Sequence, residues 1–196
     1  MKRLAIWVSL GAVLLVAAAI GVWAFQQQAS DGDAPVGGEV TLPSTQGDFS
    51  LSQLEDDQLA VLFFGYTYCP DVCPMTLAVI RQALQRLDND LAARVVPVFI
   101  TVDPERDTLE RLDEYVSYFG ESFIGARGSQ AQLEDIAGRY GIFWRKVEME
   151  DSEMEYTVDH SSSMYLVDRE GRILQRVLYS PNPHGLIAAL ENELGA

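Results

Sequence analysis

The segment from residue 59 to residue 87 constrains the fold more than any other part of the chain. Residues 59–64 form a continuous apolar run rich in branched and aromatic side chains, typical of a strand buried on both faces. Between residues 75 and 87 the apolar side chains recur every three or four positions, which predicts an amphipathic helix. The loop between this strand and this helix holds the only two cysteines, Cys69 and Cys73.

The rest of the domain alternates strands and helices. Residues 94–102 are expected to form a strand parallel to the first, joined to it by a right-handed crossover. Gly171 suits a tight turn between the last two strands. The other expected elements are an opening hairpin at 40–42 and 49–51, helices at 108–119, 130–140 and 184–194, and strands at 164–167 and 173–178. This order predicts a thioredoxin-like α/β fold, with a central mixed sheet flanked by helices.

The two cysteines have three interpretations. They are four residues apart, so on a helical turn both sulfurs would share one face and could bind one soft metal ion. They could instead be a redox-active dithiol, and the start of a helix favours the thiolate that either role needs. A structural disulfide is the least favoured interpretation, because so short a loop restrains the unfolded chain little.

A third metal ligand is suggested by His160. It stands just before the apolar run 164–167, so it is expected near the end of the sheet, where ligands usually bind. A lone histidine is more often a solvent-facing or hydrogen-bonded residue. Two thiolates and an imidazole together suit copper better than any hard cation.

Three blocks of sequence carry a resemblance to a known family. They are GYTYCPDVCP at 65–74, TVDPERDT at 101–108 and VDHSSSMYL at 158–166. In this order and register, over residues 39–196, they resemble the Sco/SenC family of copper-binding assembly factors for cytochrome c oxidase. The resemblance implies one copper ion per chain, Cu(I) or Cu(II), bound by Cys69, Cys73 and His160. Leu109 departs from the proline that the family often has there, which concerns only the entry to a helix.

The resemblance implies a copper chaperone that helps to assemble the binuclear copper centre of the oxidase, and the N-terminal residues described below predict that it is tethered to a membrane. Its partners would be the copper-bearing oxidase subunit and other periplasmic copper carriers, and it would supply ligands without catalytic turnover. The alternative is a thiol-disulfide oxidoreductase that uses Cys69 and Cys73 to reduce the cysteines of the oxidase copper site, although the usual thioredoxin gap is two residues. A metal site needs His160, whereas a simple dithiol does not. A peroxidase of the same fold is a more distant alternative.

The N-terminus predicts a membrane anchor. After Lys2 and Arg3 the chain runs through residues 4–25 without a charge, long enough to cross a hydrocarbon core of about 30 Å as a helix. The two cations should stay in the cytoplasm, which places the domain on the periplasmic side of a bacterial inner membrane. Cleavage near Ala24 or Ala29 is the alternative. The expected organisation is an uncleaved anchor at 1–25, a flexible polar linker at 26–38 and a copper-binding domain at 39–196.

The charge excludes nucleic acid as a partner. Lys2 and Arg3 are two of the 14 basic residues, so beyond the anchor twelve cations stand against 29 acids, a formal charge of about −17. Such a surface suits basic partners or cations.

Several further polar residues and methionines are expected to have structural rather than chemical roles. His184 is expected to be exposed or capping, and Asp71 either tunes the metal or faces water. The charged loop residues are expected to order the thiol site rather than to form a catalytic cluster. The two methionines of the acidic stretch 148–155 are expected to pack flexibly at the surface rather than to pass copper along. These loop residues and methionines are Asp103, Glu105, Arg106, Asp107, Met149 and Met154.

Overall fold

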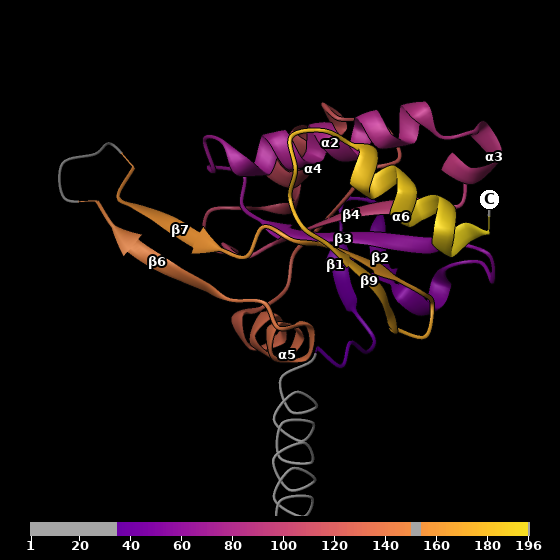
Figure 1. The fold of residues 1–196 in the computed structure, drawn as a ribbon. Coiled ribbons are helices and arrows are strands. Elements are labelled where there is room, and N and C mark those ends of the chain that lie inside the picture. The colour runs from indigo at the N-terminus through magenta and orange to yellow at the C-terminus, as the bar shows by residue number, and fades with distance from the viewer. Residues whose placement is uncertain (1–34, 150–153, 196) are drawn as a thin grey trace, which may run out of the picture. The chain divides into compact units, whose positions relative to one another are not determined.

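The computed structural model describes residues 35–149 and 154–195, and a mixed sheet of seven strands forms their centre (Figure 1). The strand order is β2-β1-β5-β4-β3-β8-β9. The strands are β1 (Thr41–Ser44), β2 (Gly47–Ser50), β3 (Leu59–Gly65), β4 (Val95–Thr101), β5 (Ile124–Ala126), β8 (Met164–Val167) and β9 (Ile173–Val177). The helices are η1 (Leu51–Gln53), α2 (Val72–Arg86), α3 (Asn89–Ala92), α4 (Leu109–Ser117), α5 (Gln130–Tyr140) and α6 (His184–Leu194). This is the α/β architecture that the sequence predicted.

Strand β3 lies in the middle of the sheet and is buried along its whole length. It pairs in parallel with β4, as predicted, from Leu59 opposite Val95 to Gly65 opposite Thr101. On its other side it pairs antiparallel with β8, so that Phe63 stands opposite Met164. The end of β3 and the start of β8 therefore lie side by side, which brings the cysteine loop close to the segment that carries the histidine.

Alternate side chains of β3 pack on opposite faces of the sheet, as the two-residue period of a strand requires. Helices α2, α4 and α6 cover one face and α5 the other (Figure 1). On the first face the ring of Phe63 lies 5.9 Å from that of Phe99. On the second, Phe64 contacts Tyr140 of α5 and Tyr165 of β8, with ring centroids 6.2 Å apart in both pairs. The end of β3 is thus packed on both faces.

Several predicted elements have the observed bounds, including helices 130–140 and 184–194 and strand 164–167. Thr108 caps α4, because its hydroxyl accepts a hydrogen bond from the Arg111 N–H. The turn at Gly171 is also confirmed, with φ at 78°. The predicted start of the first helix at residue 75 was wrong: α2 begins at Val72, since Pro74 is tolerated within a first helical turn.

The sequence did not predict the second sheet of the described residues, a hairpin of β6 (Trp144–Glu148) and β7 (Tyr156–His160). Figure 1 shows this hairpin extending away from the larger sheet. Its two strands pair antiparallel, with Trp144 opposite His160. The last residue of β7 is thus the predicted metal ligand.

The expected anchor at 1–25 lies outside the described residues, as does the linker as far as residue 34. The described end of the linker is attached to the domain: the N–H groups of Val36 and Gly37 donate to the Arg139 carbonyl, and that of Gly38 to the Gly171 carbonyl. Within 35–149 and 154–195, no helix is both long enough and apolar enough to span a membrane.

Candidate metal centre

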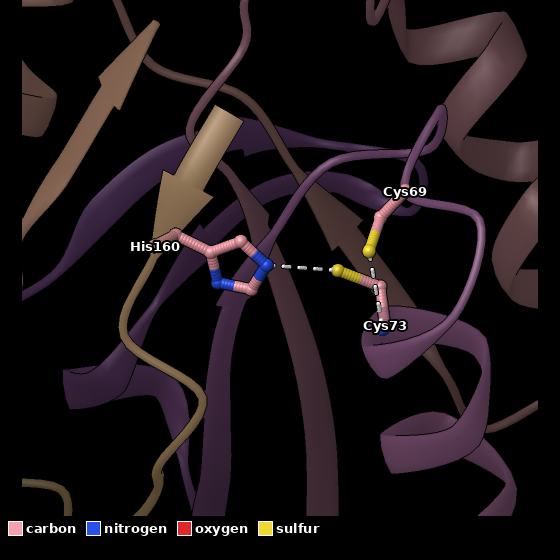
Figure 2. A group of neighbouring side chains, drawn as sticks. All are labelled: Cys69, Cys73 and His160. Carbon is pink, nitrogen blue, oxygen red and sulfur yellow. Dashed lines mark hydrogen bonds between the residues drawn. The ribbon is translucent and has the colours of Figure 1, made fainter. Parts of the chain in front are cut away.

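Cys69, Cys73 and His160 come together at the end of β3 (Figure 2). Their sulfur and ring nitrogen atoms all lie within 4.8 Å of one another. Cys73 is fully buried, whereas Cys69 and His160 are partly exposed. Neither cysteine is in a disulfide, so the three donor atoms form a group that could hold a metal ion.

The spacing of the two cysteines suggested that both lie on one helical turn, but the structure shows that they do not. Cys69 lies in the loop after β3, and Cys73 is the second residue of α2. The Cys73 N–H points at the Cys69 sulfur, 3.5 Å away. The loop therefore folds back over the start of α2, where unpaired N–H groups favour a negative charge on the Cys69 sulfur.

The orientation of the His160 ring is fixed from both sides. Its Nδ1 lies 2.9 Å from the Ser161 carbonyl oxygen, which can only accept, so Nδ1 carries the proton of the neutral ring. The Nε2 lone pair is then free to face the thiols, and Nε2 lies 3.2 Å from the Cys73 sulfur. The ring packs edge-on against Tyr66, with centroids 5.8 Å apart. This is the arrangement that a metal-binding histidine requires.

The pKa values of the two thiols are shifted in opposite directions. The pKa of Cys69 is lowered to about 3, chiefly by the hydrogen bond from Cys73. Burial raises this pKa, whereas hydrogen bonds from His160 and from backbone N–H groups lower it further. Burial, together with the hydrogen bond and charge of Cys69, raises the pKa of Cys73. At neutral pH the metal-free protein therefore has a thiolate at Cys69 and a thiol at Cys73.

This difference predicts the alkylation behaviour of the metal-free, reduced protein. Between about pH 6 and about pH 8 the rate at an ordinary thiol rises about tenfold per pH unit, because the thiolate fraction rises. Iodoacetamide should instead modify Cys69 at a nearly constant rate and leave Cys73 unmodified, as peptide mass spectrometry would report. In Cys73→Ala, which lacks the main cause of the lowered pKa, the rate at Cys69 should again rise with pH. A steep rise with pH of the alkylation rate at Cys69 in the unsubstituted protein would contradict the assignment of a thiolate to Cys69.

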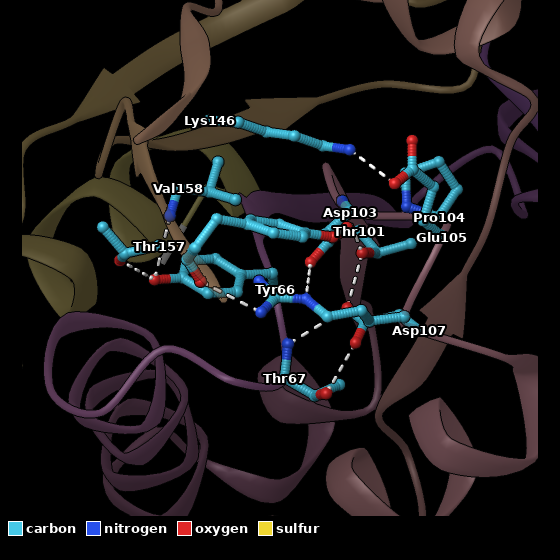
Figure 3. Close-up of polar contacts among 12 residues, drawn as sticks. Tyr66, Thr67, Thr101, Asp103, Pro104, Glu105, Asp107, Lys146, Thr157 and Val158 are labelled. Carbon is cyan, nitrogen blue, oxygen red and sulfur yellow. Dashed lines mark hydrogen bonds and ion pairs between the residues drawn. The ribbon is translucent and has the colours of Figure 1, made fainter. Parts of the chain in front are cut away.

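The charged loop after β4 orders the thiol site, as the sequence predicted. The buried Asp107 carboxylate accepts hydrogen bonds from the Thr67 N–H at 3.0 Å and the Thr67 hydroxyl at 2.6 Å, and from the Thr101 hydroxyl at 2.6 Å (Figure 3). Burial raises the pKa of Asp107, and the three donors oppose that change. Since Thr67 lies two residues before Cys69, Asp107 fixes the base of the thiol loop.

The remaining candidates lie outside this group. His184 is exposed at the start of α6, as expected, and its N–H donates to Asn182. Asp71 is exposed, and Met149 lies at the end of the hairpin strand β6, at the surface. Residues 150–153 of the acidic stretch lie outside the described part of the chain.

Sequence reasoning missed the tyrosines that surround the site. Tyr66 contacts His160, and Tyr156, at the start of β7, donates to Asp103 at 2.8 Å. Apolar and polar residues alternate from 156 to 159, which indicates a strand, but a pattern of four residues is too short to predict one from the sequence.

The donor set fits a soft metal ion. Two cysteine sulfurs and one imidazole suit Cu(I), whereas zinc in a structural site usually takes four protein ligands. No aspartate or glutamate completes the group among the described residues. The fold and the site together define a thioredoxin-like domain with two thiols and an imidazole that could hold a metal ion.

Comparison with known proteins narrows this class to one family. The family model described as SCO1/SenC matches residues 28–195, so the chain belongs to the SCO1/SenC family. This confirms the resemblance carried by the three sequence blocks. An SCO2-like protein of Rickettsia conorii is 34% identical over 158 residues, which cover 81% of this chain and 77% of that protein.

Solved relatives share the fold. ScoI of Arabidopsis thaliana with copper bound is 34% identical, with a TM-score of 0.73, and the match covers 82% of this chain and 98% of that one. ScoI of Bradyrhizobium japonicum with copper bound is also 34% identical, with a TM-score of 0.69, and the match covers 81% and 99%. Homologous structures therefore hold copper, and this chain has a group of three donors that could do so.

Proposed function

We propose that the protein is a metallochaperone that holds one copper ion through Cys69, Cys73 and His160. It delivers this ion to the binuclear copper centre of cytochrome c oxidase, whose copper-bearing subunit is its partner. The observation that carries the proposal is the convergence of two sulfurs and one imidazole nitrogen within 4.8 Å. Copper in the related ScoI structures and the role of Sco proteins in oxidase assembly support it.

The site is suited to receiving and releasing an ion. Cys69 already carries a negative charge in the metal-free state, so copper displaces only the Cys73 proton on binding. Cys69 and His160 are partly exposed, so a partner's ligands can reach the ion from the solvent side. Three ligands leave a soft ion open to an incoming fourth, which permits transfer by ligand exchange. The test is oxidase assembly in a strain whose only copy carries His160→Ala.

A second candidate function is reduction of the cysteines of the oxidase copper site, favoured by the partly exposed thiolate at Cys69. In that reaction Cys69 attacks a disulfide of the partner to form a mixed disulfide. Cys73, after losing its proton, then attacks Cys69. The partner leaves with two thiols, and the protein keeps a Cys69–Cys73 disulfide, which an external dithiol must reduce.

We further propose that residues 1–25 anchor the protein in a bacterial inner membrane, with the domain in the periplasm. Lys2 and Arg3 in front of the uncharged residues 4–25 support this orientation. A reporter fused after Ala196 should be active only outside the cytoplasm, and the protein should stay with membranes after a high-salt wash. Recovery of a soluble form that begins near Ala29 would establish a cleaved signal instead.

A further inference from the structure

No backbone pairing joins the strand that presents His160 to the main sheet among the described residues. Among the described strands, β7 pairs with β6 alone, in a two-stranded sheet separate from the seven-stranded one. The backbone ladder that fixes β3 and the start of β8 therefore does not fix His160. Contacts between side chains of the hairpin and of the domain therefore help to set the distance from the imidazole to the two sulfurs.

Arg106 makes several of these contacts. Its Nη1 donates to the Tyr156 carbonyl at 3.0 Å, and its guanidinium lies over the Tyr156 ring, 3.6 Å from the centroid. Its Nε donates to Asp103 at 2.5 Å, and the Tyr156 hydroxyl donates to the other oxygen of the same carboxylate at 2.8 Å. Arg106, Asp103 and Tyr156 thus form a closed set of contacts between the loop after β4 and the start of β7.

The same guanidinium also contacts the segment that carries Cys69. It lies 4.7 Å from the centroid of the Tyr68 ring and 5.8 Å from that of Tyr66. The Tyr66 hydroxyl in turn is 2.8 Å from the Thr157 hydroxyl, and it accepts a hydrogen bond from the Val158 N–H at 3.4 Å (Figure 3). Arg106 therefore lies between the thiol loop and the histidine strand and contacts both.

The chemistry of Arg106 suits this position. A planar guanidinium can stack on aromatic rings and donate in its own plane at the same time, which a lysine cannot do. The Asp103 carboxylate that pairs with it is completely buried, and the Arg106 side chain is 18% exposed. Its Nη2 is buried and makes no hydrogen bond to another of the described residues.

The exposed ion pairs of the hairpin are weaker links. Lys146 pairs with Glu105 at 2.5 Å, but both side chains are exposed, and such pairs contribute little in water. Arg145 pairs with Asp159 within the hairpin itself, so that pair does not connect it to the domain.

We propose that Arg106 is a positioning residue that holds His160 within reach of the two thiols, through Asp103 and Tyr156. This inference rests on the proposed copper site. The thiol loop has its own support in Asp107 and Thr67, so loss of the Arg106 contacts releases the imidazole and leaves the sulfurs in place.

The test compares Arg106→Gln with Arg145→Gln, a matched change in the exposed pair of the same hairpin. In the full-length protein loaded with copper under anaerobic conditions, X-ray absorption of Arg106→Gln should retain two sulfur ligands and lose the imidazole nitrogen. Copper affinity should fall by about 10- to 100-fold. Arg106→Lys should not restore either property, whereas Arg145→Gln should match the unmodified protein. An unchanged nitrogen signal and affinity in Arg106→Gln would overturn the inference.

Hydrogen exchange of the metal-free protein gives a readout that needs no copper. The Val158 N–H reports the contact between hairpin and domain, and the Thr67 N–H reports the thiol loop. In Arg106→Gln the first should exchange at least about tenfold faster and the second at an unchanged rate. Equal rates at Val158 in both proteins would also overturn the inference.

Two further outcomes are distinguishable. If the unmodified protein binds no copper, the proposed function fails, while the exchange rates still decide the role of Arg106. If Arg106→Gln does not fold, Tyr156→Phe, which removes one hydroxyl, undergoes the same measurements, with the exposed Tyr118→Phe as its control.

Discussion

Replacing His160 with alanine should abolish assembly of active cytochrome c oxidase in cells grown with scarce copper. The variant lacks one of three ligands but keeps both thiols, so it can still form a disulfide. Its copper affinity should fall by more than the roughly 100-fold typical for loss of a residue that only supports a ligand. Oxidase activity, measured in a strain whose only copy carries the substitution, should recover in part when copper is added in excess.

His184→Ala is the matched control, because His184 is the other histidine of the chain and lies exposed at the start of α6. It should leave oxidase activity unchanged at both copper levels. The same strains should be assayed for reduction of a disulfide-bonded oxidase copper domain. If the dithiol reaction is the main function, His160→Ala retains most activity, since the imidazole only tunes a thiol. Normal oxidase in scarce copper would therefore refute the chaperone function.

Replacing Gly65 with alanine should damage both the fold and the site. A Cβ at this last residue of β3 would lie 2.6 Å from the Cys73 sulfur and 2.8 Å from a ring carbon of Phe99. Cys73 and Phe99 are fully buried, so neither has space to move away. Overpacking of this kind costs about 1–3 kcal/mol of unfolding free energy. Displacement of the Cys73 sulfur should lower copper affinity as well.

Gly138→Ala provides the control for this substitution. Gly138 lies inside α5, and a Cβ there would meet nothing within 4 Å. Because alanine has a higher helix propensity than glycine, the unfolding free energy of this variant should rise by about 0.5–1 kcal/mol. Its copper affinity should not change. Denaturant unfolding and copper titration would measure both effects. Unchanged stability and affinity in Gly65→Ala would show that Cys73 is not tightly packed against β3.

The sequence predicted the elements that carry a strong hydrophobic pattern. Strand β3 is an uninterrupted apolar run, and α5 begins at a Ser129 capping box and ends at Gly141, so their bounds could be read almost directly. Strand β5 has only three residues, too few to show any period. Most of β6 is exposed or half-exposed, so the hairpin lacks the apolar pattern on which such predictions depend.

The three candidate ligands could be picked out because cysteine and histidine are few in this chain and stand next to recognisable strands, and the structure brings them together. Their support was only partly predictable. The charged loop 103–107 was expected to order the thiol site, and Asp107 does so. The role of Arg106 could not be read from the sequence, because it depends on Tyr156, which lies fifty residues away on a strand that the sequence did not predict.

The central claim is that Cys69, Cys73 and His160 bind one copper ion together. Its most direct test is metal analysis and X-ray absorption of the reduced protein after anaerobic loading with copper and removal of the excess. The account predicts one copper per chain, with two sulfur ligands and one imidazole nitrogen, and loss of that nitrogen in His160→Ala. Failure to retain copper, or a site with oxygen ligands only, would contradict it.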